Sequence, residues 1–178
     1  MPAKKCTKVV VGGVAAAAMV LVSGCSSPAK AKKVPDDLCA VMTAPPLTRL
    51  LAGGTPQHRA KNDKLTSRAD CELSSGADDF EVDLERHGGT KKHGASYWSQ
   101  RAYKSTKDSH TWTYRCSNPP ASPRLGKDSF ECRSDKRLEI TVRKGKDVLS
   151  LVLTGPRAAQ PDAIEVLRGY ADQIVKAL

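Results

Sequence analysis

The sequence lacks the short motifs that usually mark an enzyme. Its 178 residues contain no Gly-x-Ser-x-Gly, P-loop, His-Glu-x-x-His or EF-hand spacing. The one Ser-x-x-Lys, from Ser27 to Lys30, has no Lys-Thr-Gly partner and gives no penicillin-binding site. No motif therefore indicates a hydrolase or a nucleotide-binding protein, and we expect a protein that is not an enzyme.

Metal ligands are also scarce. The four histidines are scattered, no Cys-x-x-Cys or close His-x-His occurs, and His87 with His93 is the best local pair. A zinc site needs three or four convergent ligands. Asp78, Asp79 and Asp83 follow no calcium-loop spacing, and we expect them to be solvated. We therefore expect neither a metal nor another cofactor.

Aromatic residues make up only 4% of the chain, yet several fall in one short stretch. One interpretation is a buried contact between a middle helix and an adjacent strand, because aromatic rings supply large buried areas. The other is a groove for an apolar or glycan ligand, beside Arg115. The residues of this possible groove are Tyr97, Trp98, Arg101, Trp112 and Tyr114.

The most informative feature that is present lies at the N-terminus. Three lysines precede an apolar run of only 14 residues, from Val9 to Val22, whereas a membrane-spanning helix takes about 20. The run ends in Leu-Val-Ser-Gly-Cys, which resembles the lipobox of bacterial lipoproteins. The resemblance implies cleavage after Gly24 and a diacylglycerol lipid on Cys25. Ordinary secretory cleavage, with Cys25 a chance neighbour, is the alternative.

This signal divides the chain into three parts. Residues 1–24 are expected to be a signal peptide, residues 25–35 a lipidated tether with too little apolar surface to fold, and residues 36–178 a single extracytoplasmic domain. We expect the protein on the extracytoplasmic face of the cell membrane, held by the lipid on Cys25. Its predicted role is that of a noncatalytic binding or accessory domain, and an envelope hydrolase with an unrecognised active site is the alternative.

The positive charge narrows the range of partners. Without residues 1–24 the chain keeps 26 basic and 19 acidic residues, a net charge of +7. The basic residues are spread along the chain without an RNP-like strand, helix-turn-helix or zinc-finger spacing, so we expect no nucleic acid. An anionic envelope polymer or an envelope protein would suit the charge. We expect the domain to be a monomer.

Export also decides how the cysteines are interpreted. Cys6 leaves with the signal and Cys25 carries the lipid, which leaves an even number in an oxidising compartment: Cys39, Cys71, Cys116 and Cys132. Two disulfides are predicted. Three pairings are possible, and we favour Cys39–Cys71 with Cys116–Cys132 because sequential pairs close the shorter loops.

The pattern of apolar residues predicts an α+β fold, with an antiparallel sheet of about five to six strands flanked by N-terminal, middle and C-terminal helices. Strands are expected at 68–73, 80–85, 111–116, 129–132, 138–142 and 148–153. A helical turn is expected after Asp36 and Asp37, and further helices at 43–52, 95–104 and from Pro161 to the end. Residues 55–66 are polar and contain Pro56, so a surface loop is expected there.

Several of these features together resemble the actinobacterial DUF3558-type lipoproteins. They are a Leu-Cys-x-x-x-Thr at residues 38–43, the cysteine at 71, Arg-Leu-Gly-Lys-Asp-Ser-Phe at 124–130, a charged hairpin and a final amphipathic helix. Glu72 stands where such domains often have an aromatic residue. The resemblance implies an antiparallel sheet flanked by helices, related to the Mog1/PsbP-like sandwich, and no established catalytic role.

Overall fold

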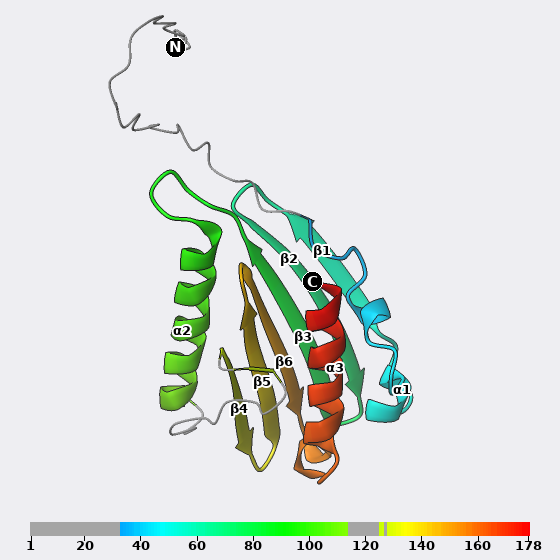
Figure 1. Ribbon diagram of the computed structural model, residues 1–178. Coiled ribbons are helices and arrows are strands. Elements are labelled where there is room, and N and C mark those ends of the chain that lie inside the picture. Colours follow the sequence, from blue (N-terminus) through cyan, green and yellow to red (C-terminus); the bar gives the residue numbers. More distant parts are fainter. Residues whose placement is uncertain (1–32, 114–124, 127) are drawn as a thin grey trace, which may run out of the picture.

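The computed structural model describes residues 33–113, 125–126 and 128–178; the side chains of 110–113 lie outside the description. One antiparallel sheet of six strands, in the order β1-β2-β3-β6-β5-β4, forms the centre of the molecule (Figure 1). The strands are β1 (Gln57–Asn62), β2 (Thr66–Ser75), β3 (Asp78–His87), β4 (Ser129–Ser134), β5 (Arg137–Lys144) and β6 (Asp147–Thr154). The predicted α+β class is confirmed.

Helices lie on both faces of this sheet (Figure 1). Adjacent residues of a strand point to opposite faces. On β4, Phe130 contacts Tyr103 of α2 (Ala95–Thr113), whereas Glu131 binds Arg168 of α3 (Ala163–Ala177). The 3-10 helices η1 (Cys39–Val41) and η2 (Pro156–Ala159) and the short α1 (Leu47–Leu50) complete the elements. The helix α2 therefore covers one face and α3 the other.

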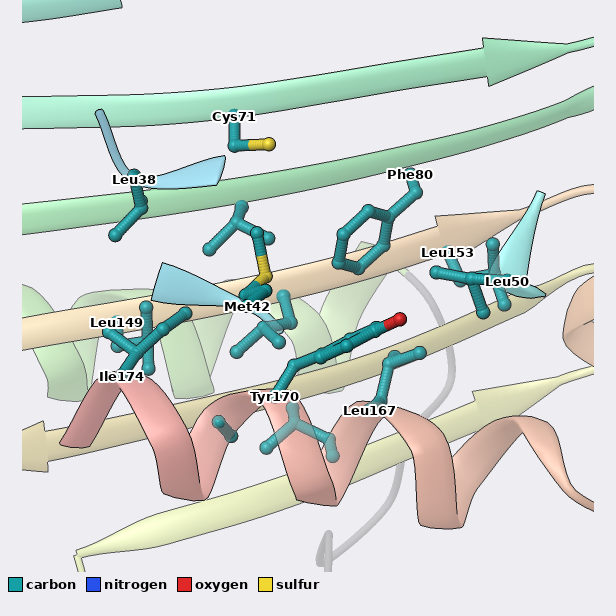
Figure 2. Close-up of a cluster of buried hydrophobic side chains, with 14 of the residues drawn as sticks. Leu38, Met42, Leu50, Cys71, Phe80, Leu149, Leu153, Leu167, Tyr170 and Ile174 are labelled. Carbon is teal, nitrogen blue, oxygen red and sulfur yellow. The ribbon is translucent and has the colours of Figure 1, made fainter. Parts of the chain in front are cut away.

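The hydrophobic core lies between the sheet and α3. The alternation on β2, β3, β5 and β6 sends one set of apolar side chains to this face, and the helix presents its apolar stripe to them. Figure 2 shows Tyr170 of α3 beside Phe80 of β3, with ring centroids 5.9 Å apart. The Tyr170 hydroxyl donates a hydrogen bond to the carbonyl of Pro45, and burial raises the pKa of this phenol to about 12.

The segment before α1 is held by α3. Gln173 accepts hydrogen bonds from the backbone N–H groups of Thr43 and Ala44 and donates one to the Ala44 carbonyl. The helix expected at 43–52 is shorter in the structure: α1 begins after Pro46, without a side-chain cap, and ends at Leu50. The expected acid before the first helical turn is present, because Asp37 accepts a hydrogen bond from the N–H of Ala40.

Two predicted elements differ in the structure. Residues 57–62, expected to be a loop, form the edge strand β1. Its side chains are all exposed, so the sequence shows no apolar alternation there, and the strand is held by backbone pairing with β2.

The strand expected at 111–116 is wrong over residues 111–113, because α2 continues to Thr113. Each added helical residue gains one backbone hydrogen bond, which favours extension over a new element. Residues 114–116 lie outside the described residues.

The favoured pairing of Cys39 with Cys71 is confirmed, with Cα atoms 5.2 Å apart. It joins η1 to the core face of β2, where Cys71 is fully buried. Cys132 is also disulfide-bonded. Its predicted partner, Cys116, and the lipidation site, Cys25, lie outside the described residues.

Candidate ligand pocket

A small aromatic cluster stands at the start of α2. The imidazole of His93 stacks on Tyr97, with ring centroids 3.9 Å apart and planes 14° from parallel. Trp98 meets both rings edge-on, 5.8 Å from His93 and 5.2 Å from Tyr97. The loop before the helix fixes His93, because its carbonyl accepts a hydrogen bond from the N–H of Thr90 and its own N–H donates to the Thr90 hydroxyl.

A pocket of about 280 Å³ opens beside this cluster, between the start of β2, the end of β3 and α2. The strand pairing places Thr66 directly opposite His87, and the N–H of Gly88 donates to the carbonyl of Leu65. The lining is mostly apolar. Its residues are Leu65, Thr66, His87, Gly88, Thr90 and Trp98.

Two polar atoms of the lining residues are buried without hydrogen-bond partners among the described residues: Nε1 of Trp98 and Nε2 of His87. Burial lowers the pKa of His87, although Glu85, with Oε2 at 3.7 Å from Nε2, and Asp147 act in the opposite direction. The imidazole is therefore neutral near pH 7. The lining residues provide apolar walls, and two of them carry a buried N–H donor and a neutral imidazole, a combination that suits a ligand with an apolar body and a polar end.

Only some of the residues of the predicted groove lie together in the structure. Tyr97 and Trp98 lie together beside the pocket, whereas Arg101 is exposed on α2 and does not line it. The side chain of Trp112 and all of Tyr114 lie outside the described residues. Tyr103, a further aromatic residue of α2, packs against the sheet, with its ring 5.7 Å from that of Phe130 of β4.

Sequence reasoning missed the contribution of the two strands to the pocket. Leu65 lies in a loop, as the sequence predicts, but nothing in that polar segment indicates a ligand site, and His87 is predicted only as a possible metal ligand beside His93. The predicted hairpin could have indicated them. Its second strand ends near His87, and a hairpin places the end of the second strand opposite the start of the first, which is Thr66 of β2. Within the described ranges, no group of three histidine, cysteine or acidic side chains is placed to hold a metal ion.

A second hollow, of about 570 Å³, lies on the charged part of the sheet formed by β1, β2 and β3. Its charges neutralise one another: Arg59 pairs with Asp70 at 3.0 Å and also with Glu72, and the neighbouring Arg68 pairs with Asp83. Because these groups already have partners, the apolar pocket is the better candidate for a ligand.

Comparisons with known proteins identify no relative: no family model, curated protein or solved structure matches the chain. The resemblance to DUF3558-type lipoproteins stays a prediction. In the part of the chain that the structure describes, no helix is long and apolar enough to cross a membrane.

Proposed function

We propose that the protein is a membrane-anchored extracytoplasmic lipoprotein whose folded domain binds a ligand without transforming it. The observation that carries the binding role is the pocket beside Trp98, with its apolar lining and the unpartnered Nε1 and Nε2 atoms of Trp98 and His87. The ligand class is a small molecule with an apolar body and an acceptor group that reaches the indole N–H.

The anchor is supported by the lipobox at residues 21–25 and by the disulfide between Cys39 and Cys71, which fits an oxidising compartment. A single acyl chain binds a membrane only marginally, whereas the two or three chains of a lipoprotein hold it durably. We expect Cys25→Ser to shift the protein from the membrane fraction to the soluble fraction. Ser26→Ala is the matched control and should stay with the membrane. Equal retention of both variants would contradict lipid anchoring.

Ligand binding can be tested with anilinonaphthalene sulfonate, which has an apolar body and a charged acceptor. We expect it to bind the intact protein and to quench Trp98, observed in a Trp112→Phe background. Replacing Trp98 by Phe keeps an aromatic ring but removes the N–H, and should weaken binding about five- to tenfold, the effect of one hydrogen bond. Arg101→Ala is the control: an equal loss there would place the ligand in the groove predicted from the sequence.

Native mass spectrometry of the intact protein from its own envelope would identify the natural ligand. We expect a retained small molecule that is lost in Trp98→Phe. A protein that carries no small molecule, and that also fails to bind the fluorescent probe, would contradict a ligand-binding role.

The second candidate, an envelope hydrolase, has one observation in its favour. His87 is neutral and lies beside Glu85 at the pocket, an arrangement that suits a general base. Turnover of an ester, peptide or glycan in a substrate panel, lost in His87→Gln, would establish this function. Turnover that survives this substitution would argue against the site.

A further inference from the structure

The folded domain receives its tether at one defined point. The carbonyl of Lys33 accepts a hydrogen bond of 2.7 Å from Arg86, and the next residue, Val34, is only 4% exposed. Arg86 is itself fixed by a buried ion pair with Asp147. The chain therefore joins the domain at the end of the sheet where β3 finishes and β6 begins, which we call the tether end.

The tether is too short to turn the domain over. Lys33 is eight positions after Cys25 in the sequence, so the tether between them spans at most about 28 Å when fully extended. The strand β2 runs the length of the sheet with ten residues, about 33 Å. A lipid on Cys25 would thus keep the tether end within about 28 Å of the bilayer and prevent the domain from standing upright on the opposite end of the sheet.

Two loops at the tether end lie side by side. The loop between β1 and β2 (residues 63–65) meets the loop between β3 and α2 (residues 88–94) through the hydrogen bond from Gly88 to Leu65, 2.6 Å long. Figure 1 shows both loops at the same end of the molecule, at the upper edge of the view. The pocket beside Trp98 opens between them.

The side chains on this surface combine positive charge with apolar area. Lys64, Lys91 and Lys92 are exposed and form no ion pair with any described residue, while Lys61 is paired with Asp63 at 3.5 Å. The large hydrophobic side chains exposed in the described part of the chain are Leu65, at 53%, and Tyr97, at 43%. Both belong to this end of the domain.

Such a combination suits one partner in particular. Lysines next to a bilayer are attracted by anionic headgroups, and leucine and tyrosine side chains enter the interfacial layer. Resting on the proposed lipid anchor, we infer that the tether end docks on an anionic lipid surface. Leu65 and Tyr97 enter the interface, the three lysines face the headgroups, and the pocket opens toward the membrane.

The test uses the intact lipoprotein reconstituted in two kinds of vesicle, pure phosphatidylcholine and phosphatidylcholine with one quarter phosphatidylglycerol. Amide hydrogen exchange is followed by mass spectrometry. We expect loops 63–65 and 88–94 to exchange more slowly on the anionic vesicles only. The turn between β4 and β5, which includes Asp135 and Lys136 at the opposite end, should exchange equally on both and serves as the internal control.

Charge variants then test the contact directly. One lysine near an anionic surface contributes about a fivefold change in equilibrium constant, so Lys91→Gln with Lys92→Gln should weaken docking about 25-fold and return loop exchange to its rate on neutral vesicles. Lys136→Gln is the matched control and should keep the protection. Unchanged exchange in the sheet will show that each variant is folded.

The outcomes separate the docking proposal from the anchor. Lipoprotein that floats with both kinds of vesicle but shows equal loop exchange would overturn docking and leave the anchor intact. Protein that floats with neither, and whose Cys25 carries no lipid mass, would overturn the anchor. Protection of the loops by soluble polyphosphate, but not by anionic vesicles, would also overturn docking and indicate a polymer partner.

Discussion

The guanidinium of Arg86 and the carboxylate of Asp147 form a buried two-point ion pair across β3 and β6, with N–O distances of 2.6 and 3.1 Å. The third arm of the guanidinium binds the carbonyl of Lys33. Both residues are at most 8% exposed. The pair therefore joins two central strands and fixes the start of the folded chain with the same side chain.

Replacing Arg86 by Met should lower the free energy of unfolding by about 3–5 kcal/mol, because it leaves the Asp147 carboxylate buried without a counter-charge. Urea unfolding followed by circular dichroism measures the change. Arg101→Met, at an exposed position of α2, should change it by less than about 0.5 kcal/mol. Adding Asp147→Leu to Arg86→Met should restore part of the loss. A double variant less stable than the single one would contradict this account.

The disulfide between Cys39 and Cys71 should stabilise the domain mainly through the unfolded chain. It closes a loop with a sequence separation of 32 residues, for which the chain-entropy model gives about 4 kcal/mol. We expect the double replacement by Ala to cost about 3–5 kcal/mol in urea unfolding, including the lost buried sulfur contacts. Nonreducing peptide mapping should recover the Cys39–Cys71 peptide. A free Cys39 thiol in the mature protein would contradict the pairing.

Asp83 should make the domain less stable as the pH rises toward neutrality. The expectation that Asp83 is solvated was wrong: its side chain is only 21% exposed, and burial raises its pKa from 3.8 to about 6, against the opposing charge of Arg68 and with the help of Glu85. The folded state thus binds the proton more tightly than the unfolded state, so the contribution of Asp83 to stability is complete below about pH 4 and is lost as the carboxyl ionises through pH 6.

Asp83→Asn should remove this loss. We expect the variant to be more stable than the native protein by about 2 kcal/mol at pH 7.5, and the difference to vanish near pH 4. Denaturant unfolding over this pH range measures both. Asp79→Asn, at an exposed position of the same strand, is the control. A constant difference between Asp83→Asn and the native protein at every pH would contradict the assignment.

Two glycines with positive φ should tolerate a side chain very differently. At Gly145 (φ +60°) a Cβ would meet open space, whereas at Gly155 (φ +100°, ψ −172°) it would lie 2.3 Å from the carbonyl oxygen of Ala77. Gly145→Ala should therefore cost about 1 kcal/mol, from backbone strain alone. Gly155→Ala should cost about 3 kcal/mol or more, because strain and a backbone clash add. Thermal unfolding compares the two, and equal losses would contradict the geometry.

Sequence patterns predicted the sheet wherever one face of a strand is buried. The alternation in residues 80–85 and the apolar residues of 138–142 and 148–153 correspond to β3, β5 and β6, because side chains two positions apart point to the same face of a strand and the core requires apolar side chains there. The stripe of the final helix was found for the same reason. The edge strand β1 left no such trace, since its stability comes from backbone pairing, which any sequence can supply.

Only part of the candidate pocket could be predicted from the sequence. The clustering of Tyr97 and Trp98 is visible in the sequence because they are neighbours on one helix. Their alignment with Leu65 and His87 depends on the register of β2 against β3 and on the face of the sheet that α2 covers. No local pattern encodes where a helix rests on a sheet.

The sequence by itself determined the class of fold, the favoured disulfide between Cys39 and Cys71 and the expectation of a lipid on Cys25, because each depends on local spacing or on counting cysteines. Tertiary structure alone decided that Arg86 fixes the start of the domain. It also placed the unpaired lysines, Leu65 and Tyr97 at that same end. These residues lie far apart in the chain, and only strand pairing and helix packing bring them together.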